Sequence, residues 1–231
     1  MVASLRDFYA FEQHVKTCRG HRGLEMVPQW YQVPVFYFSN PVAIIGDGDP
    51  VWAPQGSAAL DYELELACVI GTAARDLPAD DSAMECVAGF TVMNDWSARD
   101  IQRAEMAVGL GPSKSKDFAT SLGPVVAPFE GLRDAYRDGR LQLEMTARVN
   151  GKEYSRGNAG TMYWTWPQVL AQASRDTELR PGDVIGSGTV GTGCILELTP
   201  EAVGGWLKPG DVVELTIERI GTLRNPIVER P

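Results

Sequence analysis

Apolar and polar positions alternate most clearly in the segment "DYELELACVIG", and this spacing predicts a strand over 62–70. Successive side chains of a strand point to opposite faces. One face therefore carries Tyr62, Leu64, Leu66 and Cys68, and the other carries Glu63, Glu65, Ala67 and Val69. The two carboxylates lie roughly 6–7 Å apart on one face and repel each other by roughly 3 kcal/mol at an effective dielectric of 20. Either they face water, or they bind a cation together.

The same reading predicts short elements along the rest of the chain. Apolar residues at helical spacing predict a helix over 5–19, followed by a loop over 20–34 and an aromatic strand over 35–39. Further helices are expected near 81–86, 96–105 and 165–174, and strands at 87–95, in "GDVIGSG", in "CILELT" and in the C-terminal segment "DVVELTIERIGTLRNPIV". Asn150-Gly151 lies between two alternating runs within 141–155, which is a strong hairpin signal.

Many short strands separated by Gly and Pro turns, with few helices, predict a β-rich α+β fold. The 231 residues suffice for one large domain. A net charge of −9 argues against a nucleic-acid partner and against an anionic membrane surface. No apolar run is long enough to span a membrane. The N-terminal residues lack the pattern of a secretion signal, so a cytoplasmic location is expected.

Several familiar motifs are excluded by their context. "GSGTVG" (186–191) matches a dinucleotide fingerprint in letters, but a strand rather than a helix is expected after it, so it is interpreted as a glycine-rich turn. No G-x-S-x-G segment supports a serine hydrolase. The four cysteines form no C-x-x-C pair, and His14 and His21 are the only histidines. A structural zinc site is therefore not expected, and the cysteines are expected to be free thiols.

Asp95 ends the apolar strand "FTVMND" and has two possible uses. It could cap the helix expected to begin at Trp96, which would contribute about 1 kcal/mol. Alternatively it could join Glu63 and Glu65 around a hard divalent cation, which prefers oxygen ligands.

Four segments, taken in order, resemble the fumarylacetoacetate hydrolase family over nearly the whole chain: "DYELELACVIG", "MNDWSARDIQ", "KSKDFATSLGP" and "LRPGDVIGSGTVG". The segment "DFYAFEQH" (7–14) also resembles the D-F-Y-x-x-x-Q-H segment of the hydrolase that gives the family its name. The resemblance implies the family's C-terminal catalytic domain, a mixed β-sandwich or β-roll with a few short helices. Residues 1–40 would form a mobile helix or lid segment, and 41–231 the β-rich core.

The resemblance also implies the roles of twelve residues. The metal ligands would be Asp7, Glu63, Glu65 and Asp95, binding Mg²⁺, with Ca²⁺ or Mn²⁺ as alternatives. The catalytic residues would be His14 as the base, Glu197 as its partner and Lys116 near the metal. The substrate contacts would be Tyr9, Arg99, Gln102, Thr120 and Thr189. Asp7 and His14 are seven residues apart, so a continuous helix would present both on one face.

Three of the residue assignments have an alternative. Lys114 competes with Lys116 as the lysine of the site, and Glu25 competes with Glu197 as the partner of His14. The aromatic residues Tyr163, Trp164 and Trp166 belong either to the core or to a pocket for the substrate tail.

The predicted function is hydrolysis of a C–C bond in a 1,3-diketo acid such as an acylpyruvate, with a divalent metal and with His14 activating water. The first alternative is a decarboxylase, hydratase, isomerase or cyclase acting on a 2-oxo acid by related chemistry. The second is a non-catalytic protein that binds metal or ligand. The expected partner is a small 2-oxo or diketo acid, and family members are usually homodimers.

Overall fold

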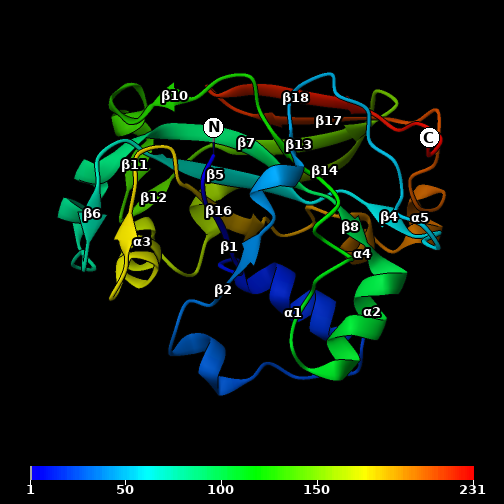
Figure 1. Cartoon of the computed structure of the whole chain (residues 1–231), viewed down its shortest axis with the longest axis horizontal. Helices are drawn as coiled ribbons and strands as arrows, with labels where there is room; N and C mark the ends of the chain where they lie inside the picture. The colour runs from blue at the N-terminus through cyan, green and yellow to red at the C-terminus, as the bar shows by residue number, and fades with distance from the viewer. Residues whose placement is uncertain (1) are drawn as a thin grey trace.

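The computed structural model describes residues 2–231 and contains two main sheets. The larger sheet has eight strands (Figure 1). In spatial order they are β2 (Phe36–Ser39), β1 (Leu5–Phe8), β16 (Val184–Thr189), β5 (Leu64–Ile70), β7 (Val87–Asp95), β9 (Thr120–Leu122) and β3 (Ile44–Ile45), with β10 (Ala127–Pro128) also paired to β7. Strand β1 is parallel to β16, β3 is parallel to β9, and the other pairs are antiparallel. The sheet is therefore mixed.

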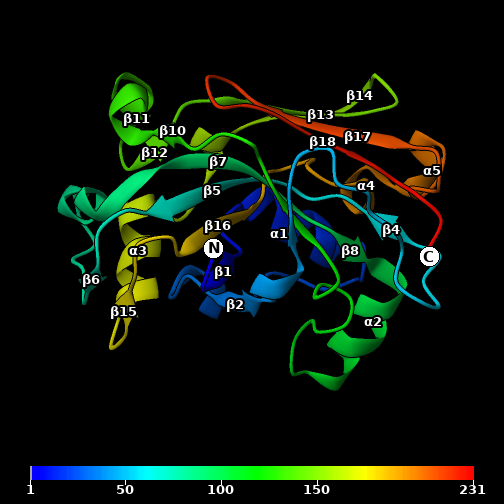
Figure 2. The ribbon, with the colours of Figure 1, turned by 45° about the horizontal axis from the view of Figure 1, so that its top comes forward.

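The second sheet has four antiparallel strands and packs on one face of the first (Figure 2). Its strands, in order, are β14 (Lys152–Asn158), β13 (Glu144–Val149), β17 (Val212–Ile217) and β18 (Gly221–Pro226). Leu64 and Leu66 of β5 are buried in one cluster with Met145 and Leu215 of the second sheet. The opposite face of β5 carries Glu65. The main core thus lies between the sheets, and the carboxylate faces away from it.

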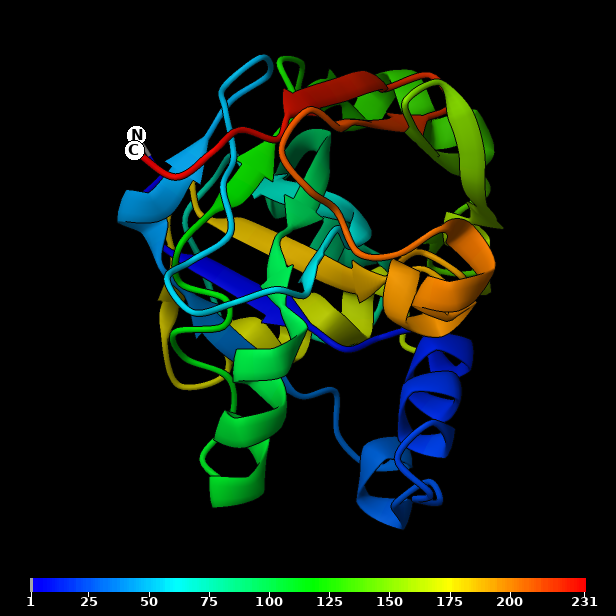
Figure 3. The same ribbon diagram turned by 90° about the vertical axis from the view of Figure 1, so that its right-hand side faces the viewer.

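The remaining elements are short. Three two-stranded sheets consist of β4 (Leu60–Asp61) with β8 (Ser97–Ala98), β6 (Ala74–Arg75) with β15 (Glu178–Leu179), and β11 (Tyr136–Arg137) with β12 (Arg140–Leu141). The α-helices are α1 (Glu12–Gly20), α2 (Arg99–Val108), α3 (Trp166–Ser174), α4 (Ile195–Leu198) and α5 (Pro200–Val203). The 3-10 helices are η1 (Pro28–Tyr31), η2 (Pro41–Ala43), η3 (Asp81–Cys86), η4 (Phe129–Ala135) and η5 (Ala159–Thr161). Helices α1 and α2 project from the side of the molecule away from the four-stranded sheet (Figure 3).

The predicted β-rich α+β fold is confirmed, as are most of the long elements. The strand predicted over 62–70 is β5, which begins two residues later, and 87–95 is β7. Asn150-Gly151 forms the turn between β13 and β14, and the C-terminal segment forms β17 and β18. The helix expected near 165–174 is α3. Among residues 2–231, no helix combines the length and apolarity that a membrane span requires.

The helix predicted over 5–19 is wrong in its first half. Residues 5–8 form β1, all four of them buried, because they pair with β16 on one side and with β2 on the other. The helix begins only at Glu12. Asp7 and His14 therefore do not share a helix face, and tertiary strand pairing has overridden the local spacing. Since β1 and β2 both belong to the larger sheet, motion of a lid would be restricted to the residues between them, and that motion stays a prediction.

Two smaller predictions near the site are also wrong. The segment "CILELT" contains helix α4 rather than a strand, because Asp61 accepts hydrogen bonds from the backbone N–H groups of Ile195 and Leu196 at 2.8 and 3.0 Å. Helix α2 begins at Arg99 rather than at Trp96, since the intervening residues 97–98 pair with β4. Its N-cap residue is Ala98, so Asp95 does not cap it.

The glycine-rich segment 186–191 lies largely on β16 instead of forming a turn. Gly188 has a φ of +79°, and a Cβ atom there would lie 2.4 Å from the carbonyl oxygen of Phe8. Both the backbone conformation and the close approach of β1 therefore require glycine at this position. Here the glycines serve strand packing.

Candidate active site

Three carboxylates from neighbouring strands converge on the face of the large sheet that points away from the four-stranded sheet. Asp7 comes from β1, Glu65 from β5 and Asp95 from the end of β7, and all three are buried. One carboxylate oxygen of each lies within 4.8 Å of the others. The strand register explains the convergence, because β16 pairs with β1 at Asp7 and with β5 at Glu65. Distant sequence positions thus form one acidic cluster.

This cluster fits a divalent cation by the chemistry of its donors. Asp7 Oδ1 and Asp95 Oδ1 are buried and accept no hydrogen bond. Burial and the charges of Asp7 and Asp95 raise the pKa of Glu65 well above its usual range. Burial and the charge of Asp95 raise the pKa of Asp7 to about 8. A hard cation such as Mg²⁺ or Mn²⁺ would use the unpaired oxygens and offset the repulsion.

Glu63 lies beside the three carboxylates but interacts with positive side chains. Its Oε1 accepts a hydrogen bond from Arg99 Nη2 at 2.8 Å, and its Oε2 forms an ion pair with Lys116. Burial acts to raise the pKa of Glu63, but Lys116 and Arg99 outweigh it and lower the pKa. Glu63 is therefore an ionised carboxylate at the border of the cluster, paired with Lys116 and Arg99.

Lys116, not Lys114, is the lysine that lies in the site. Lys116 is buried in the loop before β9 and pairs with Glu63 and Asp95. Burial acts to lower its pKa, but the charges of Asp95 and Glu63 raise it, so the ammonium stays charged. Lys114 is exposed and forms an ion pair with Asp117 at 2.7 Å.

His14 and Glu197 form a buried pair next to the carboxylates. His14 Nδ1 lies 2.8 Å from Glu197 Oε2, and His14 Nε2 lies 4.0 Å from Glu63 Oε1. Burial acts to lower the pKa of His14, but contacts with Cys194 and Glu197 raise it well above its usual range. Glu25 is exposed in the loop after α1. The structure thus pairs His14 with Glu197.

The predicted substrate contacts surround this pair and the carboxylates. Arg99 donates to Asp61 from Nε at 2.8 Å and to Gln102 from Nη1 at 3.0 Å. Thr189 donates to Glu65 at 3.3 Å, and Thr120 lies opposite Asp95 in the pairing of β7 with β9. The ring of Tyr9 packs edge-on against the imidazole of His14, with 5.5 Å between the ring centroids. All twelve predicted residues therefore lie in one region.

The aromatic residues divide between core and surface. Trp166 is fully buried against Phe90, with 5.0 Å between ring centroids, and belongs to the core. Tyr163 is partly exposed and packs against Trp30 and Tyr31 of η1 at 5.0 and 5.3 Å.

Two residues of the site were not predicted from the sequence. The hydroxyl of Tyr37 donates a hydrogen bond to Asp95 and lies 3.0 Å from Asp7 Oδ2. It lies in an aromatic strand whose pattern predicts only apolar contacts. Asp61 binds both Arg99 and the start of α4. Its spacing of two and four residues from Glu63 and Glu65 offered a signal, because alternate residues of an extended chain share a face.

Comparison with known proteins identifies the family. Residues 4–228 match the model described as fumarylacetoacetate (FAA) hydrolase C-terminal. The chain belongs to the fumarylacetoacetate hydrolase family.

Two curated relatives illustrate the range of this family. The chain is 34% identical over 198 residues to oxaloacetate tautomerase YisK of Bacillus subtilis, covering 84% of this chain and 61% of the relative. It is 31% identical over 248 residues to fumarylacetoacetase of Arabidopsis thaliana, covering 86% of this chain and 59% of the relative. It thus spans about three fifths of the length of these relatives.

A solved structure shares the fold. Fumarylpyruvate hydrolase of Pseudomonas aeruginosa, in complex with Mn²⁺ and pyruvate, superposes with a TM-score of 0.79 at 22% identity. The match covers 99% of this chain and 91% of that one. At this identity the likeness concerns the fold alone.

Proposed function

We propose that the protein is a metal-dependent enzyme that cleaves a C–C bond in a 1,3-diketo acid such as an acylpyruvate. The observation that carries the proposal is the His14–Glu197 pair at 2.8 Å, whose free imidazole nitrogen lies 4.0 Å from Glu63 at the border of the acidic cluster. A divalent cation held in that cluster would lower the pKa of His14 through its positive charge and so favour the neutral imidazole. The arrangement would then place a proton acceptor beside the candidate metal centre.

Asp7, Glu65 and Asp95, with Glu63 at their border, would hold the divalent cation. A bound cation supplies positive charge that polarises the substrate's carbonyl oxygens and stabilises negative charge developing on them. Mg²⁺ is the predicted ion, and Mn²⁺ is the natural alternative to test.

His14 would take the proton of a water molecule at Nε2, while Glu197 fixes the ring through Nδ1 and stabilises the charged imidazole. The hydroxyl of that water joins the acyl carbon, the C–C bond breaks, and the proton goes to the departing carbon. The products are two carboxylic acids. Lys116 would stabilise negative charge on the substrate, a contribution of about 3 kcal/mol for a well-placed donor. Arg99, Gln102, Tyr9, Thr120 and Thr189 are proposed to orient the substrate.

A second candidate function is isomerisation of a 2-oxo acid, favoured by the 34% identity to an oxaloacetate tautomerase. In that reaction His14 would move a proton between carbon and solvent, and no acid would be released. The same residues suffice, because His14 would accept a proton from a carbon atom of the substrate instead of from water. A protein that binds metal without turnover is the remaining alternative.

An acid-product assay separates these candidates. Chelator-treated protein is supplied with Mg²⁺ or Mn²⁺ and given acetylpyruvate, fumarylpyruvate, oxaloacetate or a 2,4-diketone that lacks the acid. Metal-dependent release of two acids from an acylpyruvate supports the hydrolase. Faster keto–enol exchange of oxaloacetate without acid release would favour the isomerase, and metal binding without either reaction would favour the non-catalytic protein. The predicted homodimer is tested separately, by light scattering against the 25.2 kDa chain mass.

A further inference from the structure

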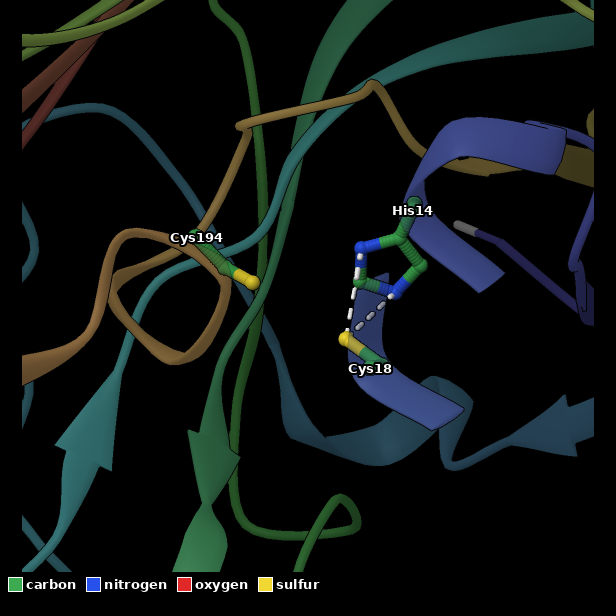
Figure 4. A group of neighbouring side chains, drawn as sticks. All are labelled: His14, Cys18 and Cys194. Carbon is green, nitrogen blue, oxygen red and sulfur yellow. Dashed lines mark hydrogen bonds between the residues drawn. The ribbon is translucent and has the colours of Figure 1, made fainter. Parts of the chain in front are cut away.

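A second group of possible metal ligands lies around the imidazole of His14. His14 and Cys18 are one turn apart on α1, and Cys194 lies directly before α4. One donor atom of each lies within 4.8 Å of the others, and all three side chains are buried. Figure 4 shows both sulfur atoms directed toward the ring. All four cysteines of the chain, these two included, are free thiols, as predicted.

Glu197 adds a fourth donor to this group. Its Oε2 lies 2.8 Å from His14 Nδ1 and 3.6 Å from Cys194 Sγ. Cys18 Sγ lies 3.8 Å from both nitrogens of the His14 ring. His14, Cys18 and Cys194 thus offer one nitrogen and two sulfurs close to one another, and Glu197 adds an oxygen next to two of them.

These distances are close to those of an occupied tetrahedral site. With Zn–S bonds of about 2.3 Å, two sulfur ligands of one zinc ion lie about 3.8 Å apart. The donor atoms of His14, Cys18 and Cys194, which lie within 4.8 Å of one another, would therefore need to approach by only about 1 Å.

The ligand types separate this group from the carboxylate cluster. Thiolate and imidazole donors select borderline-soft ions such as Zn²⁺, whereas carboxylates alone suit Mg²⁺ and Mn²⁺. The geometry points to a second site, for a soft cation, built from His14, Cys18, Cys194 and Glu197. Binding of Zn²⁺ at this site inhibits the enzyme.

Inhibition follows from the shared ligands. A Zn²⁺ ion bound to the His14 ring and to Glu197 removes the proton acceptor and its partner at once. Binding replaces the two thiol S–H bonds by Zn–S bonds and releases both protons to the solvent. The inhibition rests on the proposed function of His14, whereas the binding of the ion does not.

Cobalt binding tests the site without any turnover. Co²⁺ is added to reduced protein in excess Mg²⁺, and absorption of the cobalt–thiolate charge-transfer band is recorded in the near ultraviolet. We expect one strongly absorbing Co²⁺ per chain, displaced by Zn²⁺. Cys18→Ser and Cys194→Ser should each weaken binding at least about tenfold. Cys86→Ser is the matched control, because Cys86 is also buried but hydrogen-bonds to Ala83 on η3.

Thermal unfolding of each variant, compared with the wild type, shows whether its fold is intact. A wild type without the thiolate band, or a band that survives in both folded variants, would overturn the site. Activity is then measured with Zn²⁺ in the presence of Mg²⁺, where Cys18→Ser should require at least about tenfold more Zn²⁺ for the same inhibition. A thiolate band without inhibition of an active enzyme would leave the site intact and contradict the role of His14. Absence of turnover on every substrate would contradict the proposed function and leave the binding result unaffected.

Discussion

Individual residues of the site are distinguished by their partners more than by their chemical type. Glu63 and Glu65 are two positions apart, yet Glu63 pairs with Arg99 and Lys116, while Glu65 accepts hydrogen bonds from Gly188 N at 3.1 Å and from the hydroxyl of Thr189. The positive side chains of Arg99 and Lys116 keep Glu63 ionised. Glu65 has only neutral donors, so it is the better candidate for a metal ligand.

The two histidines allow a matched test at the residue scale. His14→Gln should lower kcat by a factor of about 10² to 10⁴, the usual contribution of a general base, and leave Mn²⁺ affinity unchanged. His21→Gln is the control, because His21 is exposed just beyond α1. Steady-state kinetics on the substrate found in the product assay would measure both. Equal kcat in the two variants would contradict the assignment of the base.

At the scale of elements, β16 links the two strands that carry Asp7 and Glu65. A Cβ atom at Gly186 would lie 2.4 Å from Asp7 Oδ1 and 2.5 Å from Met93 Cε. The strand therefore requires a residue without a side chain at the point where the Asp7 carboxylate packs on it.

Gly186→Ala should consequently displace Asp7, lowering Mn²⁺ affinity at least about tenfold and unfolding stability by about 1–3 kcal/mol. Gly131→Ala on η4 is the control, because a Cβ there meets no atom within 4 Å. Calorimetric Mn²⁺ titration and urea unfolding give the two quantities. Unchanged affinity in the Gly186 variant would show that Asp7 is not a ligand.

Helix α2 is joined to the loop that carries Lys116 through Glu105. Its carboxylate accepts hydrogen bonds from Ser113 N at 2.8 Å, Lys114 N at 2.7 Å and Ser115 Oγ at 2.6 Å. Partial burial acts to raise the pKa of Glu105, but the hydrogen bonds from Ser115 and Ser113 lower it from 4.5 to about 2. The ionised carboxylate of Glu105 thus holds the loop in place.

Because the folded-state pKa is the lower one, the stabilisation by Glu105 is complete above about pH 4.5 and is lost as the pH falls through about 2. Glu105→Gln should cost about 1 kcal/mol at pH 7, a value reduced for solvent screening, and less at pH 3. Urea unfolding at the two pH values measures the difference, with Glu85→Gln at an exposed position of η3 as the control. A cost independent of pH would contradict the assigned role.

How far the sequence predicts these elements depends on whether local or tertiary forces dominate. The long alternating strand with Glu65 and the Asn150-Gly151 turn carry their own signals, and both were predicted correctly. Strand β1 could not be predicted, because only its pairing with β16 and β2 overrides the helical spacing of residues 5–19. The resemblance supplied the twelve residues gathered in the site. Cys18 and Cys194 are 176 positions apart, and only the fold brings them to His14.

Across the whole molecule, the two faces of the large sheet have different roles. One face packs against the four-stranded sheet and forms the main core. The other carries the buried acids, which repel one another without a cation. Such a site gains stability from its ligand by mass action, about 2.7 kcal/mol at a concentration of one hundred times the Kd.

The central claim is that Asp7, Glu65 and Asp95 hold the divalent cation on which the activity depends. It is tested most directly by Mn²⁺ binding to chelator-treated wild type and to Glu65→Gln, followed by the electron paramagnetic resonance of free Mn²⁺, with turnover measured on the same samples. We predict that the wild type binds Mn²⁺ at this site and regains activity, and that Glu65→Gln loses both. A Glu65→Gln variant that binds Mn²⁺ as tightly as the wild type, or a chelator-treated wild type that stays fully active, would contradict the claim.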